Sequence, residues 1–292
     1  MHGKVCLVTG ANRGLGRATT EGLARLGATV LMVCRNGEAG EAARREIIAA
    51  TGNERISLLV ADFAVQADVR RLVAEVRAAT PRLDVLVNNA GAYFAKRTIT
   101  TDGIEATFAV NHLAPFLLTV GLLDLLRASA PARVVVVASV AHERITEAGD
   151  WQGSRRYFGL TAYSRSKLAN VLFAYELARR LHGMGITVNC CHPGLVQTAL
   201  LESGFDRWWL RWLFPLLTHR MITPEKGATT LLHLATAPEL AGVTGGYFTR
   251  SRIVASSPLS HDRELAAQLW QDSLRLTGQL PDAERAGNHP AH

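Results

Sequence analysis

The chain has 292 residues, of which 48% are hydrophobic, enough to form the core of one large α/β domain. This composition excludes a disordered chain. The formal net charge is +7, but the basic residues are spread along the whole sequence and do not alternate with aromatic residues. We therefore expect no nucleic-acid partner, whereas acidic substrates or cofactors are compatible with the charge.

The apolar run after Lys4 is too short for the hydrophobic core of a signal peptide, so we expect the mature chain to start at Met1. The most hydrophobic stretch, residues 207–217, is interrupted by Arg211 and does not reach the roughly 20 apolar residues of a membrane span. These features predict a cytoplasmic protein without an integral membrane segment.

The four cysteines form no CxxC pair, and no His/Cys cluster has the spacing of metal ligands. We expect buried free thiols and no metal site. Cys190 and Cys191 are neighbours on a predicted strand, so their side chains should point to opposite faces of the sheet.

Short apolar runs alternate with longer amphipathic stretches along most of the chain, as in repeated βαβ units. The predicted strands are residues 4–9, 29–34, 56–61, 84–89, 133–139, 186–191 and 245–248. Strands that are apolar on both faces and separated by helices indicate a parallel sheet covered on both sides. We predict a single-domain, doubly wound (Rossmann) α/β fold over residues 1–280 with a seven-stranded parallel sheet. Residues 197–223 break the alternation, and residues 281–292 are expected to be a frayed tail.

A glycine-rich loop follows the first predicted strand directly and precedes a helix. Glycines there allow a tight turn and a close approach to a pyrophosphate, whose charge the N-terminus of the helix stabilises. This position in the first βαβ unit is what a dinucleotide-binding loop requires, although a glycine-rich helix cap is an alternative. The predicted cofactor-binding residues of the loop are Gly10, Asn12, Arg13, Gly14, Leu15 and Gly16.

The end of the second predicted strand carries Arg35, at the position where an acidic residue would hold the ribose hydroxyls of NAD. Arg35 and Arg13 can bind a 2′-phosphate through charge-assisted hydrogen bonds, which favours NADP(H). Alternatively, Arg35 is a solvated strand-end residue and Glu38 reaches the ribose. Asp62 either accepts a hydrogen bond from the adenine amino group or caps the next helix.

Tyr163 and Lys167 have the i, i+4 spacing that places both on one face of a helix. A free tyrosine has a pKa of about 10, which is too high for efficient proton exchange near neutrality. Lowering it by about 3 units takes roughly 4 kcal/mol of phenolate stabilisation, within reach of a nearby cation and a positively charged nicotinamide. This pair therefore predicts an acid/base tyrosine assisted by Lys167.

The glycine loop, Asn88-Asn89-Ala90-Gly91, Asn111, Ser139, the Tyr163 and Lys167 pair and Pro193-Gly194 together resemble the short-chain dehydrogenase/reductase family over nearly the whole chain. Within this family the sequence looks most like the retinol dehydrogenase and WW-domain oxidoreductase branch. The resemblance implies that Ser139 orients the substrate oxygen, Lys167 also bonds the nicotinamide ribose, and Asn111 holds a relay water. It adds further cofactor-binding residues, namely Asn89, Ala90, Gly91, Pro193, Gly194 and Thr198, and it suggests a homodimer.

Each of these residues also has a purely structural interpretation, such as a strand-end cap for Ser139 or a turn residue for Asn111. Their occurrence together beside a dinucleotide loop favours the catalytic interpretation. His142 and His192 are expected to line the pocket and to pack a loop, respectively, rather than to act as bases.

Tyr163 follows Ser139 by 24 positions, and the intervening segment includes three aromatic residues and predicts a wall over the pocket. Residues 197–223 are rich in Trp, Phe and Leu and are expected to form a substrate lid, with a membrane-surface helix or a subunit contact as alternatives. The sequence thus predicts hydride transfer between NADP(H) and a lipophilic carbonyl or alcohol. The alternative is a non-catalytic NADP-binding sensor or scaffold.

Overall fold

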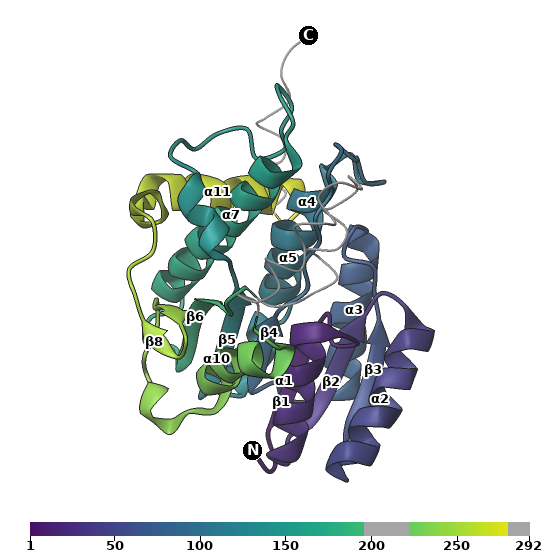
Figure 1. The fold of residues 1–292 in the computed structure, drawn as a ribbon. Coiled ribbons are helices and arrows are strands. Elements are labelled where there is room, and N and C mark those ends of the chain that lie inside the picture. Colours follow the sequence, from purple (N-terminus) through teal and green to yellow (C-terminus); the bar gives the residue numbers. More distant parts are fainter. Residues whose placement is uncertain (196–221, 280–292) are drawn as a thin grey trace.

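The computed structural model describes residues 1–195 and 222–279, and within them eight strands form one sheet in the order β3-β2-β1-β4-β5-β6-β7-β8 (Figure 1). The strands are β1 Val5–Thr9, β2 Thr29–Cys34, β3 Ile56–Val60, β4 Val85–Asn88, β5 Ala132–Val137, β6 Ile186–His192, β7 Tyr247–Thr249 and β8 Arg252–Ile253. Strands β1 to β7 are parallel, with Val5 opposite Thr29 and Cys6 opposite Val85. The strand order reverses between β1 and β4, which is where doubly wound sheets open a crevice at their carboxyl ends.

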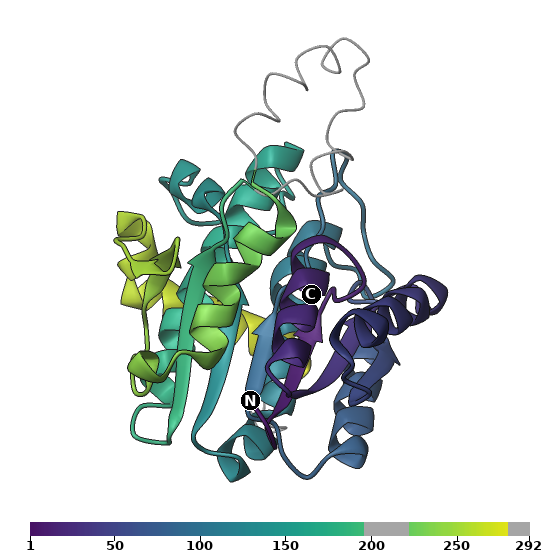
Figure 2. The same cartoon turned by 60° about the horizontal axis from the view of Figure 1, so that its bottom comes forward.

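Helices cover both faces of the sheet (Figures 1 and 2). One layer is α1 Gly14–Arg25, α2 Gly37–Thr51 and α10 Pro224–Thr236. The other comprises α3 Gln66–Ala79, α4 Ala106–Phe108, η1 Ala109–Leu113, α5 Ala114–Gly121, α6 Leu123–Ala128, α7 Gly159–Arg180 and α11 Arg263–Leu276. The short turns η2 Val140–Arg144, η4 Pro238–Leu240 and η5 Pro258–His261 complete the described helical structure.

Successive strand residues pack into opposite layers, as the pleat of a strand requires. In β1, Leu7 joins the core beneath α3, α5 and α7, while Cys6 joins the core beneath α1, α2 and α10. Cys190 and Cys191 separate in the same way, which confirms the prediction of opposite faces. All four cysteines are buried free thiols.

The predicted seven-stranded, wholly parallel sheet is wrong in one respect, because β8 adds an eighth, antiparallel strand beside β7. The turn between them places Arg250 and Ser251 at φ angles of 51° and 61°. Glycine or asparagine usually occupies such left-handed turn positions, so the sequence carries no ordinary hairpin signal. A strand of only two residues is also too short for its periodicity to be recognised.

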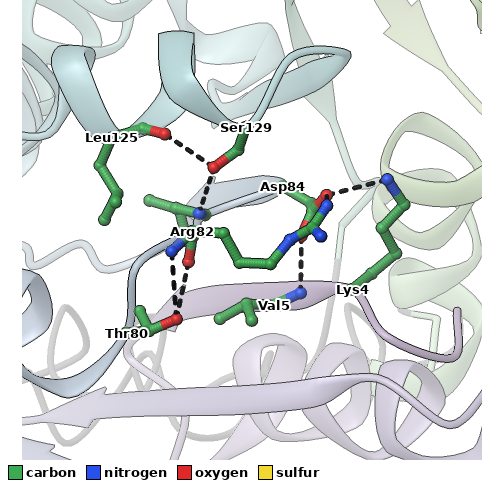
Figure 3. A network of polar contacts seen from close by, with 8 residues as sticks. Lys4, Val5, Thr80, Arg82, Asp84, Leu125 and Ser129 are labelled. Carbon is green, nitrogen blue, oxygen red and sulfur yellow. Dashed lines mark hydrogen bonds and ion pairs between the residues drawn. The ribbon is translucent and has the colours of Figure 1, made fainter.

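A network around Asp84 joins β1 to β4 at the amino ends of the strands (Figure 3). The buried carboxylate accepts hydrogen bonds from Lys4 Nζ at 2.9 Å and from Arg82 Nη2 at 2.6 Å. It also accepts from the backbone N–H of Val5 at 2.9 Å. Nearby, Ser129 Oγ accepts from the N–H of Leu83 at 2.7 Å. The amino end of the sheet is therefore fastened by polar contacts, far along the strands from the crevice.

Among the described residues, no helix combines the length and apolar character that crossing a membrane would require.

Candidate active site

The glycine loop brings its backbone close to the end of β4. Gly10 and Gly14 have φ angles of 67° and 53°, which side-chain-bearing residues rarely adopt. A Cβ atom on Gly16 would overlap the carbonyl oxygen of Gly10 and lie 2.5 Å from Nδ2 of Asn89. The loop therefore needs glycine at these positions, and its shape fits the close approach of a pyrophosphate.

Thr9 fastens this loop to the Asn89 segment, a role that the sequence alone did not reveal. Its Oγ1 accepts hydrogen bonds from the N–H groups of Asn89 at 3.0 Å and Ala90 at 2.9 Å. In return, Asn89 Nδ2 donates to the carbonyl oxygen of Thr9 at 2.7 Å. Asn89 thus stabilises the crevice between β1 and β4.

A cavity of about 1440 Å³ runs along the carboxyl ends of the strands. Its described lining includes the predicted cofactor residues Gly10, Asn12, Arg13, Gly14, Leu15, Gly16, Arg35, Asp62, Asn89, Ala90, Gly91, Pro193 and Gly194, together with Ser139, Tyr163 and Lys167. Thr198 lies outside the described residues. The structure therefore brings nearly all predicted cofactor residues to one continuous space that ends at the predicted acid/base.

Arg13 and Arg35 are exposed and line the same part of this cavity. Neither guanidinium pairs with a carboxylate in the part of the chain that the structure describes. Glu38, the alternative ribose partner, lies in the first turn of α2 and is not part of the lining. Asp62 lines the cavity, and its Oδ1 accepts from the N–H of Ala64 at 2.9 Å, so it caps a turn before α3 rather than the helix itself. Two cations at this end of the cavity suit an anionic group.

Asn111 lies in η1, a π-helical turn between α4 and α5, and is fully buried. Its Oδ1 accepts from the N–H of Ala92 at 2.7 Å, while Nδ2 donates to the Ala92 carbonyl and to Ser166 Oγ, both at 2.9 Å. The side chain thus ties the segment after Gly91 to α7. Its amide already has protein partners, and the role of holding a relay water stays a prediction.

Ser139, Tyr163 and Lys167 meet where β5 ends and α7 begins. Lys167 Nζ donates to the Val137 carbonyl at 3.1 Å and lies 5.6 Å from the centre of the Tyr163 ring. Burial raises the pKa of Tyr163, and a hydrogen bond with Ser139 opposes that rise. Burial also lowers the pKa of Lys167 to about 8. Shifted titratable groups that converge in a cavity are typical of acid/base sites.

The sequence and the fold are similar to those of known proteins. The sequence model of the family described as short chain dehydrogenase matches residues 4–207. Retinol dehydrogenase 14 of Mus musculus is 43% identical over 292 residues, which cover 96% of this chain and 87% of that protein. Retinol dehydrogenase 11 of Homo sapiens is 40% identical over 280 residues, which cover 95% of this chain and 87% of that protein. The chain belongs to the short-chain dehydrogenase family.

Within this family, the chain is an oxidoreductase of the retinol dehydrogenase branch. A short chain dehydrogenase from Burkholderia cenocepacia J2315, solved in complex with NADP, has a TM-score of 0.69 and 30% identity, covering 85% of this chain and 96% of that one. An uncharacterized protein from Mycobacterium Paratuberculosis has a TM-score of 0.75 and 31% identity, covering 95% of this chain and 94% of that one.

Two histidines of this short-chain dehydrogenase differ from their predicted roles. His192 was expected to pack a loop but lines the cavity, and burial with the nearby His142 and Arg250 lowers its pKa to about 4. His142 was expected to line the pocket but is fully buried against Ser139. The sequence could not distinguish them because both follow strand ends, and only the packing of η2 turns His142 inward.

The segment between Ser139 and Tyr163 contributes Val140, Ala141, Glu143, Arg144 and Leu160 to the described cavity lining. Two of the three aromatic residues that suggested a wall contact other segments instead, and the third is exposed. The Tyr157 hydroxyl donates to the Phe94 carbonyl at 2.8 Å, Trp151 stacks on Phe108, and Phe158 is exposed. The predicted wall therefore exists, but other residues of the segment form it.

Sequence reasoning missed several apolar residues at the mouth of the cavity. Tyr93, Phe94, Val140, Leu160 and Leu195 line it, and the last three are 40%, 49% and 53% exposed. In the sequence these residues could have been recognised only as apolar residues that follow a strand or begin a helix. Of the expected lid, residues 197–223, only the last two lie within the described residues.

Proposed function

We propose that the chain transfers a hydride between NADP(H) and a carbonyl or alcohol carbon, with Tyr163 as the acid/base. The observation that carries this proposal is the convergence of Ser139, Tyr163 and Lys167 at one end of a cavity whose other end is the glycine loop. A bound nicotinamide supplies or accepts the hydride. The protein therefore has to orient the substrate oxygen and handle one proton.

The chain's own residues divide this work. Burial raises the pKa of Tyr163, so the phenol is protonated at neutral pH and can donate to the oxygen of a carbonyl substrate. The lowering of this pKa that efficient proton exchange requires would have to come from Lys167 and a positively charged, bound nicotinamide. Ser139 provides a hydroxyl beside the phenol, and Lys167 provides a buried positive charge below its pKa of about 8. In the direction of oxidation, the same charge stabilises the phenolate that must accept the proton from an alcohol.

NADP(H) is the proposed cofactor because Arg13 and Arg35 offer two exposed guanidinium groups at the glycine-loop end, neither of which pairs with a carboxylate among residues 1–195 and 222–279. Arg13, Gly14, Gly16 and Arg35 would hold the phosphates, and Lys167 with Asn89 and Gly91 would lie against the nicotinamide half. The Burkholderia structure solved with NADP supports this choice.

A lipophilic substrate is proposed from the apolar mouth formed by Tyr93, Phe94, Val140, Leu160 and Leu195. The names of the relatives, retinol dehydrogenases, support the same substrate class. We also propose that residues 197–223 act as a lid over this substrate and that the protein works as a cytoplasmic homodimer.

The test is NADPH oxidation by the purified chain with a series of short to long aldehydes, ketones and retinal-like compounds, in detergent-free buffer. We expect turnover that rises with apolar chain length, since each buried methylene contributes up to about 0.8 kcal/mol. Tyr163→Phe should lower kcat at least about 100-fold while NADPH affinity is retained. The control Tyr157→Phe, which removes a phenol outside the cavity lining, should keep kcat within about twofold.

If the chain were a sensor or scaffold, the unmutated protein and the Tyr163→Phe variant would bind NADPH with equal affinity, and neither would turn over any carbonyl. That result would replace catalysis with the non-catalytic alternative.

A further inference from the structure

The buried histidine beside Ser139 has no part in the chemistry described above. His142 lies in η2, three residues after Ser139, and its side chain is fully excluded from solvent. The ring packs 5.1 Å from the ring of Tyr247 in β7, measured between ring centres. A polar ring in such a place normally serves the groups to which it is bonded.

One ring nitrogen of His142 binds the catalytic strand end. Nδ1 lies 2.7 Å from the carbonyl oxygen of Ser139, which also accepts the backbone N–H of His142 at 3.1 Å. A carbonyl oxygen can only accept, so Nδ1 must carry a hydrogen. The carbonyl of Ser139 is therefore held by two donors from a single residue.

The other ring nitrogen binds the C-terminal part of the chain. The backbone N–H of Ser257 donates to Nε2 at 3.1 Å. An amide N–H can only donate, so Nε2 must carry a lone pair. The two partners together permit one form of the ring, the neutral tautomer with its hydrogen on Nδ1. Burial lowers the pKa of His142, which favours this uncharged form.

The segment around Ser257 is in turn fixed to the helix that carries Tyr163. The Tyr175 hydroxyl, on α7, is 2.8 Å from Ser256 Oγ, and Ser260 Oγ donates to the Ser257 carbonyl at 2.6 Å. Ser139 at the end of β5 is thus connected through His142, Ser257 and Ser256 to α7. This path joins the two elements whose separation sets the distance between the Ser139 hydroxyl and the Tyr163 phenol.

We propose that His142 is a positioning residue, whose Nδ1–H holds the Ser139 carbonyl and thereby orients the Ser139 hydroxyl toward Tyr163 and the substrate oxygen. Its effect on turnover rests on the proposed function, whereas its tautomer and its effect on the placement of Ser139 do not.

Two conservative substitutions separate the two hydrogen bonds of the ring. The amide Nδ2 of His142→Asn takes the place of Nδ1 and can still donate to Ser139. The amide Oε1 of His142→Gln takes the place of Nε2 and can still accept from Ser257. If His142 positions Ser139, the Asn variant should keep kcat within about threefold, and the Gln variant should lose at least about tenfold. NADPH affinity should be unchanged in both.

If the role of His142 were purely structural, both substitutions would instead lower the melting temperature without this difference in kcat. Equal kcat losses in the Asn and Gln variants, or no loss in either, would overturn the proposal. The second kinetic test is a double-mutant cycle with Ser139→Ala. His142→Gln should cost no further activity once the Ser139 hydroxyl is absent, and a fully additive loss would also overturn the proposal.

A readout without turnover keeps the inference separate from the proposed function. Nitrogen-15 NMR of the unmutated protein should show His142 as the neutral Nδ1–H tautomer at pH 7, and a crystal structure of His142→Gln should show Ser139 displaced. An Nε2–H ring, an imidazolium, or an unmoved Ser139 would refute positioning. If the unmutated protein turned over no carbonyl, the proposed function would fail while these two measurements still decided the role of His142. Should the Gln variant not fold, the Asn variant and the tautomer decide it.

Discussion

The ammonium of Lys167 lies 5.6 Å from the centre of the Tyr163 ring, and burial disfavours the charged form of both groups. The buried ammonium of Lys167 therefore lowers the stability of the folded protein. Such a charge is costly to the fold and useful only to the chemistry, so its removal should separate stability from activity.

Lys167→Met should stabilise the cofactor-free protein at pH 7, by up to about 3 kcal/mol, while abolishing turnover. The folded pKa of about 8 lies below the 10.5 of a free lysine, so the unfolded chain binds more protons between these values. Lys167 therefore makes the unmutated protein gain stability as pH rises from about 8 to 10.5. The advantage of the Met variant should shrink over that range.

Urea unfolding at pH 7 and pH 9.5 measures this difference. The exposed Lys226→Met is the control and should leave the free energy of unfolding unchanged at both values. A Met variant less stable than the unmutated protein at pH 7 would contradict the expected cost of the buried charge.

NADPH should bind at least about tenfold more tightly than NADH, a difference of about 1.4 kcal/mol. Arg35→Asp should erode or reverse this preference, because it replaces a phosphate-binding cation with a carboxylate suited to ribose hydroxyls. Fluorescence titration with both cofactors measures it. Arg45→Asp makes the same charge change on α2 at a residue outside the cavity lining and should preserve the preference. Equal affinities in the unmutated protein would rule out the NADP assignment.

His112 should make the protein sensitive to acid. Burial lowers its pKa to about 3, and its ring packs among aromatic residues with Nε2 2.8 Å from Ser273 Oγ. Because the folded pKa lies below 6.5, the unfolded chain binds more protons, and stability falls as pH drops from about 6.5 toward 3. His112→Phe should therefore increase the free energy of unfolding at pH 4.5 by about 2 to 3 kcal/mol more than it does at pH 7.5.

The comparison is thermal unfolding at the two pH values, with the exposed His182→Gln as the control. The Phe variant leaves Ser273 bonded to the Leu269 carbonyl, so a new unpaired hydroxyl does not confuse the result. An unchanged pH response would show that His112 does not carry the acid sensitivity.

Asp84→Asn should lower stability by about 1 to 3 kcal/mol and leave kcat and NADPH affinity unaltered. The substitution weakens the contacts to Lys4 and Arg82 (Figure 3). None of these three residues lines the cavity. Asp124→Asn, at a side chain that is 80% exposed, should be neutral. Chemical denaturation and steady-state kinetics on the same preparations test both parts. A large loss of activity in folded Asp84→Asn protein would mean that the two ends of the strands are coupled.

Local sequence signals were sufficient for the candidate residues that directly follow a strand or share one face of a helix. The spacing of Tyr163 and Lys167 and the glycine loop after β1 needed no knowledge of distant contacts. Thr9, Asn111 and His142 were different. Their partners are Asn89, Ala92 and Ser257, which lie 80, 19 and 115 residues away in the chain. The β8 strand was missed for a related reason, since its pairing depends on an unusual turn and not on periodicity.

The placement of Asn111 depends on the number of residues in the π-helical turn η1 as well as on the residue type. α4, η1 and α5 follow one another without a break, and an α-helix rotates each residue by about 100°. A π turn contains one extra residue, which offsets the side chains before it from those after it by about one such step. Phe108 and Phe116 can thus both face the core while Asn111 reaches Ala92. Deleting a single residue here would restore a regular helix and force either the amide or one phenyl ring away from its partners.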